Sequence, residues 1–229
     1  MSTPLRVLLV GHGRMGRLVE SLAPEYDLEI AGIVARQDAA TPEAWLPADV
    51  AIDFSSAAAV PANARALAAR GMSLVIGTTG WQAAEEALRQ DLAQLPIGVI
   101  AAPNFAIGVH IFLDVAARTA EQVASRGFAG FIHEAHHAAK KDAPSGTALA
   151  LQRAVEAGGL AVDVVSTRAG FIPGTHTVGF DSPAETITLT HTARDRTAFA
   201  RGALEAARWI HGRRGWYGLR DMLRIDPQR

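Results

Sequence analysis

The chain has 229 residues, 49% of them hydrophobic and 20% charged, a composition that excludes disorder and allows a sizeable buried core. Its formal net charge of -1 excludes a broad basic surface for nucleic acid or an anionic membrane. The absence of cysteine excludes disulfides, iron–sulfur clusters and thiolate zinc sites. No apolar run of about 18 residues is present to span a membrane, and residues 1–7 lack the charged and apolar regions of a signal peptide. We therefore expect a cytoplasmic protein that binds neither nucleic acid nor membranes.

The first hundred residues alternate short apolar runs with helical patterns. The apolar runs predict strands, and the patterns between them predict helices that begin near Met15, Ala57 and Trp81. Because strands connected through helices pair in parallel, this alternation predicts an α/β layer with helices on both faces of a parallel sheet. The expected strands are 6–10, 28–34, 50–54, 74–76 and 97–101, and the expected helices are 15–22, 57–70 and 81–94.

The rhythm changes after Asn104. In the stretch 185–190, Ile187 and Leu189 alternate with threonines, which is typical of a sheet with one open face. Strands that no longer alternate with helices indicate a second, α+β domain over residues 105–195, separate from the first domain over 1–104. The expected helices are 108–125, 145–157 and 197–211, and the expected strands are 128–134, 162–169, 176–180 and 185–190.

A glycine-rich turn connects the first strand to the first helix. Its sequence, Gly11-His12-Gly13-Arg14-Met15-Gly16, satisfies the G-x-G-x-x-G pattern of Rossmann-like dinucleotide-binding domains. The glycines allow a tight turn, the approach of the backbone to a pyrophosphate and close packing of helix on strand, and the helix N-terminus offers free N–H groups to the phosphates. We predict that residues 11–16 bind a dinucleotide; the alternative is a plain tight turn.

The end of the second strand bears on the choice of cofactor. An acidic residue that holds the ribose of NAD is expected about 20 residues after the turn, but Ala35 stands there and Arg36 follows. Because a guanidinium can bind a 2′-phosphate, we expect NADPH to be accepted, with or without NADH. Two later strand ends lead into small residues, Gly77-Thr78-Thr79-Gly80 and Ala102-Pro103-Asn104-Phe105, which we expect at the same edge of the sheet beside the nicotinamide.

The segment 133–147 is rich in histidine and allows two interpretations. His133-Glu134-Ala135-His136-His137 matches the H-E-x-x-H motif of zinc hydrolases, in which two histidines share a helical face, and Glu156 lies downstream as a third ligand. The strand-like residues before the motif and Pro144 after it are unfavourable to such a helix, so we expect no metal.

In the second interpretation, His136, His137 and Lys140 form a cationic, proton-donating cluster. Lys140 would share a face with His136 if the segment is helical, and neighbouring positive charges would lower the pKa of Lys140. Pro144-Ser145-Gly146-Thr147 then opens a helix whose N–H groups and hydroxyls can hold a carboxylate. This pattern predicts a nicotinamide-dependent reductase of a small dicarboxylate. A solvated polar loop and a catalytically silent nucleotide-binding regulator are the alternatives.

With these segments in place, the chain resembles the 4-hydroxy-tetrahydrodipicolinate reductase (dihydrodipicolinate reductase) family. The longest match runs from Glu134 to Ala148 and includes the histidine pair, Lys140 and the Pro144-Ser145-Gly146-Thr147 segment. The resemblance covers essentially the whole chain, since it extends to Gly13-Arg14-Met15-Gly16, Gly77-Thr78-Thr79-Gly80, Asn104-Phe105, Gly108-Val109, Arg168-Ala169-Gly170, Gly174-Thr175-His176 and Phe199-Ala200-Arg201-Gly202-Ala203.

The resemblance implies a fold and a reaction. Residues 1–104, with C-terminal helices within 196–229, would form the dinucleotide domain, and residues 105–195 a substrate-binding and tetramerisation domain on a mixed open sheet. The reaction would be the reduction of 4-hydroxy-tetrahydrodipicolinate to tetrahydrodipicolinate by NADPH or NADH, with loss of water, in lysine and diaminopimelate biosynthesis. The protein would be a homotetramer.

The resemblance also implies roles for the site residues. His136 would donate or accept the proton and Lys140 would donate it. Residues 11–16, 77–79 and 102–105 would line the cofactor. The dicarboxylate substrate would be bound by His137, Ser145, Gly146 and Thr147.

Three features depart from the family pattern. The glycine turn is one residue shorter than the form G-x-x-G-R-M-G, and Ala35 stands at the acidic position. Both features bear on the cofactor preference and leave the reaction class unchanged. The chain is also short for the family, and a trimmed connection is expected between Arg36 and Trp45.

Overall fold

The computed structural model describes residues 3–35 and 41–224. The chain divides into two compact units, of which the first comprises Met1–Ile107 with Arg196–Arg229 and the second Gly108–Asp195. The predicted boundaries, at residues 104 and 195, lie close to this division. Each unit has a hydrophobic core of its own.

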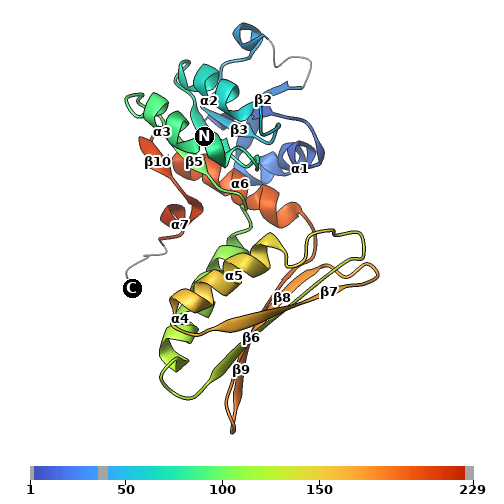
Figure 1. Ribbon diagram of the computed structural model, residues 1–229. Coiled ribbons are helices and arrows are strands. Elements are labelled where there is room, and N and C mark those ends of the chain that lie inside the picture. The colour runs from blue at the N-terminus through green and yellow to red at the C-terminus, as the bar shows by residue number, and fades with distance from the viewer. Residues whose placement is uncertain (1–2, 36–40, 225–229) are drawn as a thin grey trace. The chain divides into compact units, whose positions relative to one another are not determined.

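The first unit is built on a six-stranded, fully parallel sheet with the order β10-β5-β4-β3-β1-β2 (Figure 1). Because parallel strands share one carboxyl edge, the loops that follow β1 to β5 gather at that edge. The predicted parallel sheet is thereby confirmed. The strands are β1 (Leu5–Val10), β2 (Leu28–Val34), β3 (Val50–Asp53), β4 (Ser73–Ile76), β5 (Gly98–Ala101) and β10 (Gly215–Tyr217).

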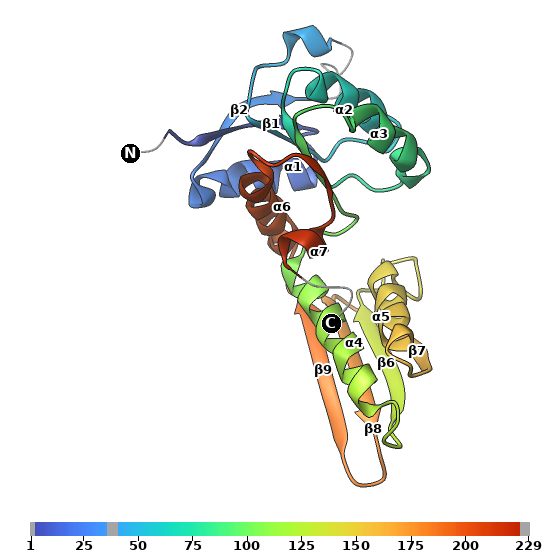
Figure 2. The same ribbon diagram turned by 90° about the vertical axis from the view of Figure 1, so that its left-hand side faces the viewer.

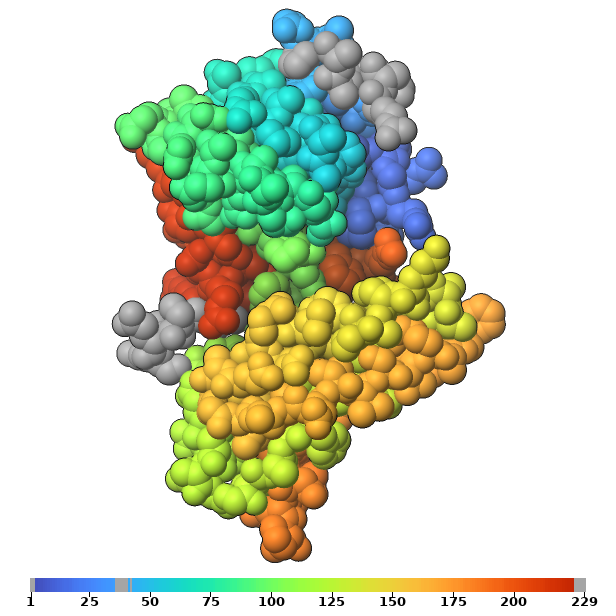
Figure 3. All heavy atoms as spheres, viewed as in Figure 1, coloured from blue at the N-terminus to red at the C-terminus, as the bar shows by residue number. Residues whose placement is uncertain are grey.

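Helices cover both faces of this sheet (Figures 1 and 2). On one face α1 and α6 pack over Val7 and Leu9, and on the other α2 and α3 pack over Leu8 and Leu74. In the space-filling view α2 and α3, in cyan and green, lie side by side over their face (Figure 3). The helices are α1 (Arg14–Leu22), α2 (Val60–Ala68), α3 (Glu85–Leu92), α6 (Thr197–Ile210) and α7 (Leu219–Met222), with 3-10 turns at Ala23–Tyr26, Pro42–Ala44 and Gln82–Ala84.

Three segments of the first unit differ from the prediction. The predicted helices 57–70 and 81–94 are shorter in the structure, because residues 57–59 form a turn and residues 82–84 a 3-10 turn. After residue 196 the sequence predicts helices alone, whereas β10 pairs with β5 as an edge strand. Three residues are too few to show an alternation in sequence, and β10 exists because the chain returns to β5.

The second unit is a four-stranded mixed sheet with the order β7-β6-β8-β9, in which only the β6–β7 pair is parallel. Two helices cover one face, where Phe112, Ile132, Leu151 and Phe180 form the core, and the other face is open, as predicted (Figure 2). Within the described ranges, no helix is long and apolar enough to cross a membrane. The elements are α4 (Ile107–Val123), β6 (Ala129–His136), α5 (Gly146–Ala157), β7 (Val162–Arg168), β8 (Gly174–Asp181) and β9 (Thr186–Ala193).

Candidate active site

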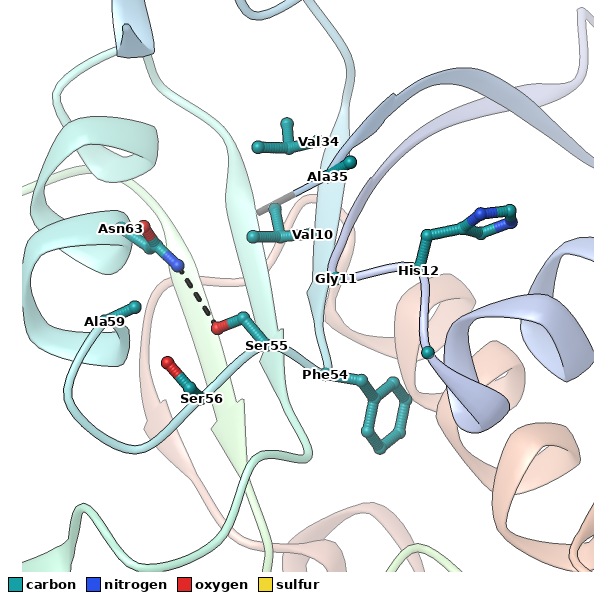
Figure 4. A pocket seen from close by; sticks show the side chains of 11 residues that line it. Val10, Gly11, His12, Val34, Ala35, Phe54, Ser55, Ser56, Ala59 and Asn63 are labelled. Atoms are coloured by element: carbon teal, nitrogen blue, oxygen red, sulfur yellow. Dashed lines mark hydrogen bonds between the residues drawn. The ribbon is translucent and has the colours of Figure 1, made fainter. Parts of the chain in front are cut away.

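The loops at the carboxyl edge of the parallel sheet enclose a cavity of about 400 Å³. Gly11 and His12 lie on one side of it, and Ser55 and Asn63 lie on the other (Figure 4). Open α/β sheets bind their ligands at this edge, so the cavity is the candidate dinucleotide site. Its lining residues are Val10, Gly11, His12, Gly13, Val34, Ala35, Phe54, Ser55, Ser56, Ala59 and Asn63.

The glycine turn has the geometry that its pattern requires. Gly11 has a φ of +91°, and a Cβ there would lie 2.5 Å from the carbonyl oxygen of Phe54. A Cβ on Gly16 would lie 2.2 Å from the carbonyl oxygen of Gly11, whereas a Cβ on Gly13 would meet no atom within 4 Å. Because α1 begins after Gly13 without a side-chain cap, its first N–H groups are available to an anion. The turn, although short, therefore fits a pyrophosphate.

Phe54 lines both this cavity and a second one of about 260 Å³. A Cβ on Gly77 would lie 2.2 Å from the Phe54 ring, so glycine is needed for the ring to occupy this position. Apolar walls beside the amide of Asn104 suit a nicotinamide ring and its carboxamide. The lining residues are Met15, Phe54, Gly77, Pro103, Asn104, Phe105, Arg196 and Phe199, of which Phe54, Arg196 and Phe199 were not predicted.

Asp53 holds together the loops that form these cavities. Its carboxylate is buried, and it accepts hydrogen bonds from the N–H and hydroxyl of Ser55 at 2.8 and 2.6 Å. The Thr78 hydroxyl donates at 2.8 Å and the Asn63 amide at 3.1 Å. The donors come from three separate segments, so one carboxylate fixes all three. No role was predicted for residues 53–56, although they stand at the end of a buried strand, as Gly77 and Ala102 do.

The predicted cofactor residues fall into three groups. Gly11, His12 and Gly13 line the first cavity, and Met15, Gly77, Pro103, Asn104 and Phe105 line the second. Another group belongs to the same loops without lining either cavity, and comprises Arg14, Gly16, Thr78, Thr79 and Ala102. Arg36 lies outside the described residues.

In the second unit, polar side chains gather at the end of β6. Glu134 and His136 point to the same face because side chains alternate along a strand. The register places Arg168 of β7 beside His136, and His176 of β8 beside Glu134. One oxygen of Glu134 accepts a hydrogen bond from Arg168 Nη2 at 2.7 Å, and the other oxygen lies in close contact with His136 Nδ1. Glu134 is fully buried.

Burial and charge shift the pKa values of this cluster. Burial alone would raise the pKa of Glu134, but the hydrogen bond from Arg168, the nearby Ser166 hydroxyl and the positive charge around it lower the pKa to about 2. Burial lowers the pKa of His136, and this effect outweighs the attraction of Glu134. Burial also lowers the pKa of His176, to about 4. Near neutral pH the cluster therefore contains an ionised carboxylate and two neutral imidazoles.

His176 connects His136 to the start of α5. The two rings meet edge-on with their centroids 5.1 Å apart, and His176 Nε2 lies 2.9 Å from Ser145 Oγ. Ser145 caps α5 by accepting a hydrogen bond from the Ala148 N–H at 3.2 Å. The next two residues are Gly146 and Thr147, and a Cβ on Gly146 would meet no atom within 4 Å. The predicted acid–base residue and the predicted carboxylate site therefore lie together.

The loop between β6 and α5 carries His137, which is exposed, and Lys140. Because β6 ends at His136 and residues 138–139 form a turn, the expectation that Lys140 shares a helical face with His136 is wrong. The Lys140 ammonium donates instead to the carboxylate of Asp142, at 2.8 and 2.9 Å. Arg168 also donates a hydrogen bond to the carbonyl oxygen of Asp142. Lys140 is thus paired with Asp142 of the same loop.

The zinc-hydrolase interpretation of residues 133–137 is wrong as well. The motif requires a helix, but Ala129–His136 forms strand β6. His133 alternates with Glu134 and faces the other side of the sheet, where its Nε2 lies 2.9 Å from Thr167 Oγ1.

The chain matches two family models in succession. Residues 5–105 match the N-terminus of dihydrodipicolinate reductase, and residues 108–223 match its C-terminus. A 4-hydroxy-tetrahydrodipicolinate reductase from Acidiphilium cryptum is 40% identical over 243 aligned positions, covering 96% of this chain and 97% of that relative. A protein of the same name from Stenotrophomonas maltophilia strain K279a is 41% identical over 239 positions, covering 96% and 98%.

Solved structures share the fold. The dipicolinate-bound dihydrodipicolinate reductase from Paenisporosarcina sp. TG-14 has a TM-score of 0.77 at 20% identity, covering 93% of this chain and 97% of that one. A DAP dehydrogenase from C. glutamicum, in complex with DAP, has a TM-score of 0.58 at 15% identity, covering 100% and 97%. Because the two family models span both units and the relatives match along nearly their whole length, this chain belongs to the dihydrodipicolinate reductase family.

Proposed function

We propose that this chain reduces 4-hydroxy-tetrahydrodipicolinate to tetrahydrodipicolinate, with loss of water, in lysine and diaminopimelate biosynthesis. Relatives about 40% identical bear the name of this activity, and the neighbour of highest structural similarity quoted above binds dipicolinate, a dicarboxylate with the same ring skeleton. The first unit holds the nicotinamide cofactor and the second unit holds the dicarboxylate.

The observation that carries this assignment is the link between His136 and α5 through His176. An imidazole that is neutral near pH 7 can accept a proton and return it. The N-terminus of α5 offers backbone N–H groups and the hydroxyl of Thr147 to a carboxylate, while Ser145, which is buried against His176, fixes the start of the helix. His137, exposed in the neighbouring loop, contacts the same substrate.

The chemistry divides between the cofactor and the chain. When bound, the reduced nicotinamide supplies the hydride for C4 of the substrate ring. Electron density that builds on the ring nitrogen is neutralised by a proton from Lys140 or His136, which lowers the barrier. The apolar walls of the second cavity, including Phe54 and Phe105, keep water away from the reacting face. The 4-hydroxyl leaves before this step as water, together with a proton from the neighbouring ring carbon, and its loss creates the conjugated ring to which the hydride adds.

We propose that both NADPH and NADH serve, with NADPH preferred. Ala35 lines the first cavity where a carboxylate would select the ribose of NAD and repel a 2′-phosphate. Arg36 is assigned to that phosphate.

We also propose a homotetramer whose subunits meet through the open face of the second sheet. Val165 is 60% exposed and Phe131 is 42% exposed on that face, and the Phe131 ring lies over Gly179. Exposed apolar side chains on one face of a sheet are typical of surfaces that a partner covers. A cytoplasmic location is part of this proposal, since the reaction consumes a reduced nicotinamide cofactor.

Absorbance at the nicotinamide band tests the reaction. Freshly condensed pyruvate and aspartate semialdehyde serve as substrate, with NADH and NADPH in parallel assays. Substrate-dependent loss of absorbance supports the proposal, and the two kcat/KM values give the cofactor preference. Absence of oxidation from folded protein that still binds nucleotide would contradict it.

Light scattering tests the assembly. Val165→Glu places a charge on the open face and is expected to reduce the molar mass of the particle. Leu149→Glu is the matched control, because Leu149 is an exposed apolar residue of α5, away from that face. An unchanged mass for Val165→Glu would exclude the open face as the interface.

A further inference from the structure

A row of polar side chains crosses the second sheet on its helix-covered face. The pairing registers align Ser166, Glu134, His176 and His191 on β7, β6, β8 and β9 respectively. This polar row borders on the apolar row that contains Ile132 and Val178. Two residues further along β6 and β7, on the same face, Arg168 lies beside His136. Burying ionisable groups such as Glu134, His136 and His176 is costly unless they pair, so the contacts among them indicate what this cluster does.

Glu134 is the centre of this arrangement. Both of its oxygens are engaged, one by the Arg168 guanidinium and the other by His136 Nδ1. With its pKa lowered to about 2, the carboxyl group is ionised over the whole range in which an enzyme of this kind works. An ionised carboxylate has no proton to donate and can only accept. An unprotonated carboxylate oxygen in close contact with Nδ1 favours the imidazole form that carries its proton on Nδ1, which can turn that N–H toward the oxygen.

This assignment leaves the second nitrogen of His136 for chemistry. A Cβ on Gly174 would lie 3.0 Å from His136 Nε2, so glycine at this position leaves room beside that nitrogen. The charged and titratable groups that face His136 are Glu134 on its own strand, Arg168 on β7, His176 on β8 and Lys140 in the loop. Of these, Glu134 alone offers an anion to the ring.

We propose that Glu134, fixed by Arg168, is a positioning residue that holds His136 in the Nδ1–H tautomer, so that Nε2 exchanges the proton with the substrate. The proposal rests on the role given above to His136 in the reductase reaction. Glu134 itself does not touch the substrate; it acts through the imidazole, as a buried carboxylate does in other acid–base pairs.

A metal site is the competing explanation for the same side chains. Glu134, His136 and His176 each place one ligand atom within 4.8 Å of the others. The Arg168 guanidinium, however, already occupies one oxygen of Glu134 and brings a positive charge against any cation. The carboxylate is therefore committed to the guanidinium and the imidazole.

Histidine NMR tests the tautomer without any substrate. In protein labelled with ¹⁵N at histidine, His136 of the unmodified chain is expected to carry its proton on Nδ1 at pH 7. In Glu134→Gln the amide presents an N–H to Nδ1, and the proton is expected on Nε2. Glu156→Gln is the matched control, because Glu156 is exposed on α5 of the same unit. An Nε2–H tautomer in the unmodified protein would overturn the proposal.

Kinetics test the consequence. Glu134→Gln is expected to lower kcat roughly 10- to 10³-fold with KM changed less than about twofold, and to move the His136 limb of the pH–rate profile to lower pH. Glu134→Asp keeps the charge and is expected to recover part of kcat, which also covers a folding failure of the glutamine variant. Unchanged kcat and pH profile in Glu134→Gln would sink the positioning role. An unchanged kcat in His136→Ala would instead remove the reductase role of His136 and leave the tautomer result intact.

Discussion

Each unit buries a carboxylate at its site, Asp53 in the first and Glu134 in the second, and the two are stabilised differently. Asp53 is surrounded by neutral donors, namely a backbone N–H, two hydroxyls and an amide. Glu134 is balanced by a guanidinium and an imidazole. Neutral donors fix loop geometry and exchange no protons, whereas the imidazole beside Glu134 can take up and release a proton. The first site therefore has a fixed geometry without proton exchange. The second site contains charged groups and an imidazole that can exchange a proton.

Removal of the Lys140 ammonium is expected to give the largest effect, and it tests whether proton transfer belongs to the second unit alone. Lys140→Ala is expected to lower kcat by roughly 10²–10⁴-fold if Lys140 is the acid, while the affinity for the cofactor stays nearly unchanged. Steady-state kinetics and nucleotide titration measure the two quantities separately. Lys141→Ala, at the exposed neighbouring residue, is the control. An unchanged kcat in Lys140→Ala would remove the assigned role.

Acid is expected to destabilise the second unit before the first. The pKa of His176 is about 4 in the folded protein against an ordinary 6.5, so the unfolded chain binds more protons between these values. The stability contributed by neutral His176 is complete above pH 6.5 and falls as the pH drops to 4, by about 3 kcal/mol. Below pH 4.5 the contribution of Glu134 is lost in turn, down to about pH 2.

Hydrogen exchange resolves the two units in one experiment. Amides of β6 and β8 are expected to lose protection between pH 6.5 and pH 4.5 relative to those of β1 and β3, after correction for intrinsic exchange rates. His176→Gln is expected to flatten this dependence. Equal losses of amide protection in both sheets would contradict the expectation that acid destabilises the second unit first.

Arg36→Ala probes the cofactor choice in the first unit. Removal of a guanidinium that binds the 2′-phosphate is expected to lower kcat/KM for NADPH about tenfold or more, with NADH changed less than about twofold. Arg17→Ala, on the exposed side of α1, serves as control. Equal losses with both cofactors would show that Arg36 does not contact the 2′-phosphate.

A pair of glycine substitutions gives the smallest effects and the sharpest assignment. A Cβ meets no atom within 4 Å at Gly13 or at Gly146, so alanine is tolerated at both positions in the free protein. Gly13→Ala is expected to weaken cofactor binding about threefold to tenfold through contact with the pyrophosphate, and Gly146→Ala to raise KM for the dicarboxylate by a similar factor. Each variant controls for the other. If Gly13→Ala changed only the KM for the dicarboxylate, or Gly146→Ala only cofactor binding, the assignment of the two sites would be contradicted.

The parallel sheet could be predicted because its signals are local. Val7 to Val10 form an apolar run that is buried on both faces of the sheet. The glycine turn after this run predicts the helix that follows. The histidine segment was also visible, since its residue types and spacing are chemically distinctive. These features need no knowledge of which segments become neighbours.

The remaining parts of the site depend on contacts between distant segments. The role of Asp53 depends on Asn63 of α2 and Thr78 of the loop after β4, which reach its carboxylate only in the folded protein. No role was predicted for Glu134, at the end of the predicted strand 128–134, because nothing in the sequence shows that β6 runs on to His136 and aligns with His176 and Arg168. Strand register is a property of the folded sheet, and these partners follow from it.

The polar row has a consequence for folding itself. If β6 slipped by two residues against its neighbours, every side chain would keep its face, and the apolar alternation would not oppose the error. Glu134 would nevertheless lose its alignment with Ser166 and His176 and its contact with Arg168. A buried carboxylate without its cation costs several kcal/mol, so the misaligned sheet is strongly disfavoured. The charges around Glu134 therefore favour the observed alignment of β6 with its neighbours over one shifted by two residues.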